Sequence, residues 1–216
     1  MARSSQNMEL ENLPQILWQS GSGVSLKAFS GEGARPYLNQ IAALRIDHYR
    51  EFPYLYDGSF ENEKRYLDPY FNSKNSKILL VFDLDKVVGF SNSLPLAEES
   101  DWLVKPFERA DLKPSDYLYM SDFILKAPYR GKGLLRRFFE AHEKNAHING
   151  CSKLAMMTVK REPSHPQRPE GYQPLDDMWR HFGMDVVPEC EIVFLWNQVD
   201  TKKEEHNRLQ VWSKTL

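Results

Sequence analysis

The chain has 216 residues and a mass of 25.3 kDa, of which 41% are hydrophobic and 27% charged, so one domain can bury a full core. The formal net charge of −2, the sequence pI near 6.3 and the lack of a long basic run argue against a nucleic-acid-binding or membrane-surface protein. These properties favour a small molecule as the preferred partner.

Targeting and redox signals are weak. Residues 1–23 lack a positive-then-apolar signal pattern, and the longest apolar runs are far shorter than a membrane span, so we expect a cytoplasmic protein. Cys151 and Cys190 form no CxxC pair. We expect both to be buried, reduced thiols, and we expect no metal site.

The predicted elements alternate along the chain. Polar residues 1–23 predict a flexible N-terminal tail. Apolar runs of strand length predict strands at 24–29, 78–83, 87–93, 118–125, 154–159 and 192–196. Helical patterns predict a helix that opens at Pro36, one at 62–71, a short one within an insertion at 98–116, one that begins at Leu134, and one at 175–182.

The helix that begins at Leu134 has one apolar face and is expected to end near Gly150. Phe138 and Phe139 lie on this face and are predicted to pack against a sheet. We expect His142 to be buried and hydrogen-bonded rather than catalytic.

The most informative segment lies between the strand at 118–125 and this helix. Pro128 interrupts the apolar run, and Gly131 and Gly133 flank Lys132 directly before the helix. Glycines let the backbone approach a phosphate closely, the N–H groups of the first helical turn lack intrahelical partners, and Arg130 and Lys132 add positive charge. This pattern predicts a cradle for a nucleotide-like diphosphate.

Three alternatives compete for this loop. A Walker A loop requires GxxxxGK followed by Ser or Thr, but Leu134 follows Gly133 here. A dinucleotide-binding fingerprint requires GxGxxG, of which the chain has only the first half. An ordinary strand–turn–helix connection, with glycines that serve only the turn, explains the same residues.

The segment Arg130-Gly131-Lys132-Gly133-Leu134-Leu135 resembles the pyrophosphate-binding loop of the GNAT N-acetyltransferase superfamily. Leu135 departs from that pattern, which usually has a small residue at this position. The order of the predicted elements also resembles the GNAT fold over residues 24–200, and 178–184 is similar to the family's last helix end. The segments 52–58, 129–131 and 165–169 are similar to a bacterial subgroup whose substrate is unassigned.

The resemblance implies the α/β (α+β) GNAT acyl-CoA N-acyltransferase fold, a mixed central sheet flanked by helices, at 24–200, followed by a C-terminal extension at 201–216. It implies acetyl-CoA as cosubstrate, no metal, and acetyl transfer to a small-molecule amine by direct attack in a ternary complex. The implied cofactor-binding residues are Phe123, Ile124 and Leu125 through their backbone, and Arg130, Gly131, Lys132, Gly133, Leu134 and Leu135.

The implied catalytic residues are less specific. Asp122 matches a position where family members often carry a carboxylate, and it is either the general base or a structural strand-end residue. Trp179 stands where these enzymes often have an acidic tyrosine, and an indole N–H is too weak an acid for that role. Tyr172 or His165 could replace it, or either residue could simply order its loop.

Two segments are candidates for the acceptor site. An aromatic cluster with one acid would suit a cationic amine, and a proline-stiffened basic loop would suit a carboxylate on the same acceptor. The candidate residues are Tyr49, Phe52, Tyr54, Tyr56, Asp57, Arg161 and Arg168. Core packing and a solvated basic loop explain these segments equally well.

A non-catalytic acyl-CoA-binding protein is the alternative function, and the oligomeric state, including a homodimer, stays open.

Overall fold

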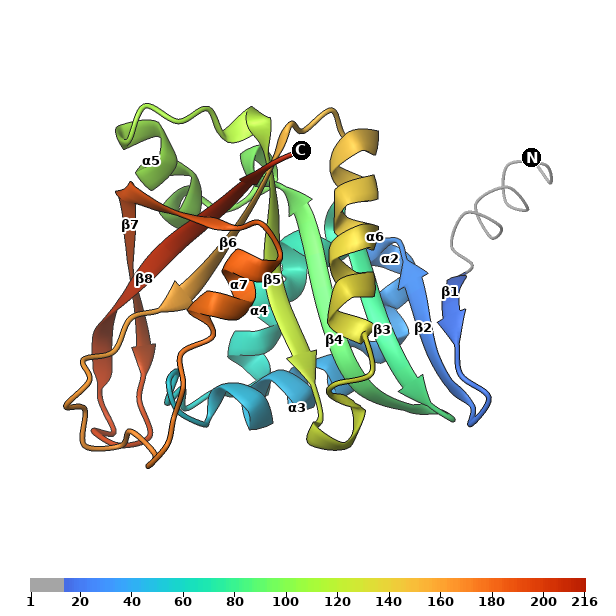
Figure 1. The fold of residues 1–216 in the computed structure, drawn as a ribbon, viewed down its shortest axis with the longest axis horizontal. Helices are drawn as coiled ribbons and strands as arrows, with labels where there is room; N and C mark the ends of the chain where they lie inside the picture. Colours follow the sequence, from blue (N-terminus) through green and yellow to red (C-terminus); the bar gives the residue numbers. More distant parts are fainter. Residues whose placement is uncertain (1–13) are drawn as a thin grey trace.

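The computed structural model describes residues 14–216, which form one eight-stranded sheet with helices on both faces (Figure 1). The strand order is β1-β2-β3-β4-β5-β6-β8-β7, and the neighbours are antiparallel except for the parallel pair β5 and β6. The strands are β1 (Gln15–Gln19), β2 (Val24–Phe29), β3 (Lys77–Asp83), β4 (Lys86–Pro95), β5 (Tyr117–Leu125), β6 (Lys153–Val159), β7 (Asp185–Asn197) and β8 (Glu204–Thr215).

The α-helices are α2 (Gly31–Ala34), α3 (Leu38–Tyr49), α4 (Phe60–Asn72), α5 (Asp101–Arg109), α6 (Leu134–Ile148) and α7 (Asp176–His181). Short 3-10 turns lie at Arg35–Tyr37, Leu96–Glu98, Pro114–Asp116 and Ala127–Tyr129. Helices α6 and α7 cover one face of the sheet, and α3 and α4 cover the other (Figure 1). Within residues 14–216, no helix is long and apolar enough to cross a bilayer.

The mixed sheet flanked by helices confirms the expected fold class. The strand at 24–29 has the predicted bounds, and the other predicted strands and helices lie within longer or slightly shifted elements. Cys151 and Cys190 are free and buried, as expected.

Both predicted chain ends differ from the structure. Residues 15–19 of the expected N-terminal tail form β1, which pairs with β2, whereas residues 1–13 of that tail lie outside the described residues. Most of the expected extension at 201–216 forms β8, which lies between β6 and β7. The fold therefore extends nearly to the last residue.

Strand β8 was not predicted because Glu204 to Arg208 are all polar or charged and the strand contains no long apolar run. Its burial nevertheless follows the period of a strand, and Val211 and Trp212 are fully buried. Strand β7 is also much longer than the predicted 192–196, and its pairing with β8 is irregular between Val186 and Glu191. Together, β7 and β8 form a long hairpin.

Helix α6 packs its apolar face on the sheet as predicted, with Phe138 and Phe139 buried. His142 is fully buried, with Nε2 2.7 Å from Ser91 Oγ and Nδ1 2.9 Å from Ser93 Oγ. Burial lowers the pKa of His142 to about 3, and nearby Lys77 adds to this effect. The imidazole is therefore a neutral core group that ties α6 to β4.

The sheet opens between its two parallel strands. Strands β5 and β6 pair only from Tyr117 to Tyr119, and β6 then continues along β8. At the point of divergence, Asn92 of β4 lies opposite Asp122 and Ser93 lies opposite Met120, so Ser121 is an extra residue in β5. Such a bulge bends a strand and turns it away from a neighbour. The edge of β5 from Ser121 to Leu125 therefore faces open space rather than β6.

Candidate active site

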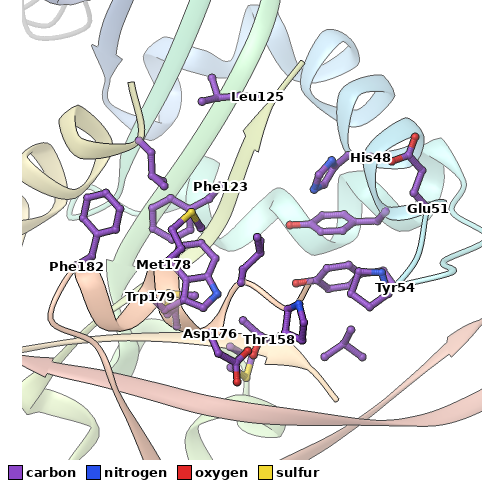
Figure 2. A pocket seen from close by; sticks show the side chains of 18 of the residues that line it. His48, Glu51, Tyr54, Phe123, Leu125, Thr158, Asp176, Met178, Trp179 and Phe182 are labelled. Atoms are coloured by element: carbon purple, nitrogen blue, oxygen red, sulfur yellow. The ribbon is translucent and has the colours of Figure 1, made fainter. Parts of the chain in front are cut away.

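A cavity of about 790 Å³ occupies the opening between β5 and β6. Its walls come from the glycine loop and the start of α6, from β6, from α7, and from the segment that follows α3. Figure 2 shows one aromatic and apolar wall and a second wall across from it. The first contains Phe123, Met178, Trp179 and Phe182, and the second contains His48, Glu51 and Tyr54.

The glycine loop adopts the conformation that an anion cradle requires. Gly131 has φ +71° and Gly133 has φ +75°, and a Cβ at either position would meet no atom within 4 Å. Only glycine adopts this left-handed conformation without strain, and the open space leaves the backbone accessible. Gly133 is the N-cap of α6, where no described side chain caps the free N–H groups. These groups are free to bind an anion.

Most of the residues expected to bind the cofactor line this cavity: Phe123, Leu125, Arg130, Gly131, Gly133, Leu134 and Leu135. Ile124 and Lys132 do not line it. The Ile124 side chain is buried with α3 and α4 on the opposite face, so only its backbone is at the open edge. Arg130 is exposed, and its Nε donates to the Leu125 carbonyl at 2.8 Å.

The apolar wall explains why Leu135 stands where the GNAT loop pattern usually has a small residue. The half-buried Leu135 side chain packs in the cluster that α6 forms with α7 and contributes to the wall of the cavity. Phe123 packs against both Phe139 and Trp179, at ring-centroid distances of 5.1 and 5.6 Å. The Trp179 Nε1–H is buried and has no acceptor among the described residues. A buried donor of this kind is costly unless a ligand accepts its hydrogen bond.

Three residues expected in the acceptor site, Tyr49, Phe52 and Tyr54, form the opposite wall. Arg161 also lines the cavity, but its guanidinium holds the backbone of this wall in place. Nε donates to the Pro53 carbonyl at 2.7 Å, and Nη2 donates to the Tyr54 carbonyl at 2.9 Å and to Gln198 Oε1 at 2.7 Å. These bonds occupy much of the guanidinium that was expected to bind a substrate carboxylate.

The loop after β6 brings one of the two expected proton donors into the cavity. Tyr172 lines it, with its ring 4.7 Å from the Phe52 ring, and Arg168 lines it beside the Tyr172 carbonyl. His165 does not line it. Its Nδ1 accepts from the Gln167 backbone at 3.2 Å, and its Nε2 lies 3.9 Å from Asp200. His165 thus orders the loop.

Asp122 lies behind the cavity wall rather than in it. Its side chain is buried in an ion pair with Arg45, and the Tyr49 hydroxyl donates to Asp122 Oδ1 at 2.6 Å. Arg45 also pairs with the buried Glu63, so a single guanidinium serves two carboxylates. Burial and the nearby Asp122 raise the pKa of Tyr49 well above its ordinary value. Among residues 14–216, the hydroxyl of Tyr49 links the Asp122 carboxylate to the cavity.

Two other expected acceptor residues lie elsewhere. Asp57 is exposed and pairs with Arg50 at 2.9 Å, and it lines neither cavity described for the chain. Tyr56 lines a separate cavity on the side of α3 and α4. The acid expected beside the aromatic residues is therefore not Asp57, whose backbone N–H donates to the Asn197 carbonyl at 2.7 Å while its side chain is exposed.

The sequence analysis missed His48 and Glu51, which also line the larger cavity. Burial and nearby Arg130 lower the pKa of His48, so its imidazole is neutral near pH 7. Both residues belong to the segment that carries Tyr49 and Phe52, and their helical spacing was a usable signal. The network of Arg45, Glu63 and Asp122 had no such signal, because its members come from three elements.

Comparison with solved structures finds the same fold. The chain is similar to an N-acetyltransferase from Staphylococcus aureus Mu50, with 12% identity, 90% of this chain and 99% of that chain covered, and a TM-score of 0.56. It is similar to an acetyltransferase of the GNAT family from Streptococcus pneumoniae, with 12% identity, 89% and 99% covered, and a TM-score of 0.54.

It is also similar to Arabidopsis thaliana NAA60 in complex with a bisubstrate analogue, with 14% identity, 84% of this chain and 94% of that chain covered, and a TM-score of 0.53. No protein-family model and no curated protein sequence matches the chain. At these identities the likeness concerns the fold, and the chain has the GNAT acetyltransferase fold.

Proposed function

We propose that the protein is an N-acetyltransferase that transfers the acetyl group of acetyl-CoA to an amine of a small molecule by direct attack in a ternary complex. The observation that carries this proposal is the continuous cavity between the glycine loop and the open edge of β5. The part of the cavity at the glycine loop suits a diphosphate, and the part along the open edge of β5 suits a polar, extended chain. The fold shared with solved acetyltransferases supports the same activity.

The cavity offers acetyl-CoA three kinds of contact. The loop from Arg130 to Gly133 would bind the pyrophosphate through backbone N–H groups and the positive end of α6. The backbone of β5 from Phe123 to Leu125 is not paired with β6. Apart from the Leu125 carbonyl, which accepts from Arg130 Nε, this edge would bind the amides of the pantetheine arm and polarise the thioester carbonyl. The buried Trp179 Nε1–H would donate to an oxygen of this arm.

Acetyl transfer forms a C–N bond to the amine nitrogen and breaks the C–S bond, and the nitrogen must lose a proton. We assign that proton to Asp122 through Tyr49: the Tyr49 oxygen takes it as the Tyr49 hydroxyl proton passes to Asp122 Oδ1. The network can accept one proton because it holds two carboxylates for a single guanidinium. Tyr172 is the proton donor to the departing thiolate, since its ring lines the cavity.

The alternative, a protein that binds acyl-CoA without catalysis, is favoured by one observation. Trp179 occupies the position of the family's acidic tyrosine, and its indole cannot protonate a thiolate. Thiol release distinguishes the two functions, because a binding protein would take up acetyl-CoA and leave the thioester intact.

The test combines calorimetric titration of acetyl-CoA with thiol release in the presence of a panel of primary amines. We expect acetyl-CoA to bind, and amine-dependent release of CoA. Tyr49→Phe removes the hydroxyl of the relay and should lower kcat about 100-fold or more while leaving the Kd of acetyl-CoA within about twofold. Failure of acetyl-CoA to bind would refute the proposal. Binding without release for every amine would favour the alternative.

A further inference from the structure

The second cavity, of about 450 Å³, lies between α3, α4, α5 and β7. Aromatic rings form much of its wall: Tyr49, Tyr54, Tyr56, Tyr66, Trp102, Tyr119, Phe194 and Trp196. The rings support one another, with centroids 4.2 Å apart for Trp102 and Phe194 and 6.5 Å apart for Tyr54 and Trp196. A cavity of this size accommodates a small organic molecule, and its wall suits a flat or apolar one.

The two cavities share a wall at the opening of the sheet. Tyr49, Tyr54, Ser121 and Met157 line both of them. Ser121 is the extra residue of the β5 bulge, at the point where β5 leaves β6. A group in the second cavity therefore lies next to the end of the first cavity that is farthest from the glycine loop along β5.

The second cavity also has a buried surplus of negative charge. Glu63 lines it and is fully buried, with Oε2 paired to Arg45, which also binds Asp122. Glu63 Oε1 and Asp122 Oδ2 are buried and make no hydrogen bond of normal geometry within residues 14–216. Burial and the nearby Glu63 carboxylate raise the pKa of Tyr56 above its ordinary value.

The positive groups nearby are engaged or peripheral. Within the described lining, the cations are Arg45, which already serves two carboxylates, and Arg65, which is exposed at the mouth together with Glu204. A bound carboxylate would therefore face Glu63 without a free buried cation. An ammonium would instead balance the surplus charge and lie over aromatic faces, which attract cations.

We propose that the second cavity is the acceptor subsite, and that it selects a primary amine carried by an aromatic or apolar group without a carboxylate. The ammonium lies beside Glu63 and Tyr49, and the carrier packs among Trp102, Phe194 and Trp196. This inference rests on the proposed function for the reaction that follows binding. It replaces the expected acceptor, an amine that also bears a carboxylate.

The test uses phenethylamine as the probe, with phenethyl alcohol and free phenylalanine as its neutral and carboxylate-bearing analogues. Calorimetry on the full chain should show phenethylamine binding at least about tenfold more tightly than either analogue. Glu63→Gln should weaken phenethylamine at least about tenfold and leave the Kd of CoA unchanged. The matched control, Glu61→Gln on the exposed face of α4, should change neither affinity.

Trp102→Leu gives a second variant at a half-buried position, in case Glu63→Gln does not fold. It should weaken phenethylamine and phenethyl alcohol alike, because Trp102 packs against the carrier that both share and not against the ammonium beside Glu63. Equal or tighter binding of phenylalanine, or an unchanged phenethylamine affinity in a folded Glu63→Gln variant, would overturn the inference. Phenethylamine binding by a protein that binds no CoA would refute the proposed function and leave the subsite standing.

Discussion

At the scale of single residues, the network of Arg45, Glu63 and Asp122 has two carboxylates for one guanidinium, so its members are not equivalent. Arg45 is the sole cation in contact with both buried carboxylates among the described residues. Removal of one carboxylate leaves a matched ion pair, whereas removal of the guanidinium leaves two buried carboxylates without an opposite charge. Unpaired buried charges are far more costly than a lost hydrogen bond.

We therefore expect Arg45→Met to lower the free energy of unfolding by about 3–5 kcal/mol. Asp122→Asn should lower it by only about 1–2 kcal/mol, because Arg45 keeps Glu63 and Tyr49 keeps an oxygen to which it donates. Urea denaturation of the two variants measures the difference. Equal losses would show that the carboxylates do not share Arg45.

The buried His142 makes stability depend on pH. Its folded-state pKa is about 3, whereas an unfolded histidine titrates near its ordinary value of about 6.5. Between these pH values the unfolded chain binds a proton that the folded chain does not, so stability falls as the pH falls.

In His142→Gln, whose amide can still bond Ser91 and Ser93, this dependence should disappear. Relative to the variant, the original protein should lose about 1.4 kcal/mol per pH unit between about pH 6 and pH 4. Denaturant titrations across this range give the two curves. Parallel curves would mean that His142 is protonated in the folded protein.

At the scale of elements, helix α6 is bounded by two glycines of like conformation. Gly133 precedes it with φ +75°, Gly150 follows it with φ +70°, and a Cβ at either position would meet open space. A side chain would therefore strain the backbone similarly at both positions, and the two positions differ in what lies next to them. Only Gly133 lines the larger cavity.

We expect Gly133→Asp to raise the Kd of CoA more than about tenfold, because the carboxylate occupies and repels the place of the pyrophosphate. Gly150→Asp should leave that Kd within about twofold, although both variants are strained by similar amounts. Calorimetric titration with CoA, together with thermal unfolding of both variants, makes the comparison. If both substitutions weaken CoA binding equally, the loop is not the phosphate site.

At the scale of the whole molecule, β8 joins the last hairpin to the rest of the sheet. It pairs with β6 on one side and with β7 on the other, and its Trp212 is fully buried. Without β8, the long edge of β6 would be open and β7 would have no partner in the sheet.

A chain that ends after Asp200 should therefore show no cooperative unfolding transition, in contrast to the full chain. Lys202→Gly, in the turn before β8, is the control. Lys202 has φ +54°, so glycine should keep the transition intact. Near-ultraviolet circular dichroism during thermal unfolding distinguishes the two results. If the truncated chain unfolds cooperatively, residues 201–216 are an extension that the fold does not require.

Local sequence patterns predicted most elements and the glycine loop, because each depends on neighbours along the chain, whereas the fold class came from the resemblance to the GNAT superfamily. Residue spacing placed Gly131 and Gly133 directly before the free start of α6, and the structure then shows that both glycines have positive φ angles. The burial of His142 was predictable for the same reason, since it lies on the apolar face of its helix.

Only the tertiary structure decided which residues line the two cavities. Arg45 meets Asp122 across 77 residues, and Arg161 holds Pro53 across 108. No pattern of neighbouring residues encodes such contacts. Tyr56 and Asp57 are adjacent in sequence, yet one lines a cavity and the other is exposed, because the backbone there is bridged to Gln198 and sends successive side chains in different directions. Long-range packing of α3, α4 and β7 around the opened sheet therefore determines which charges the cavities hold.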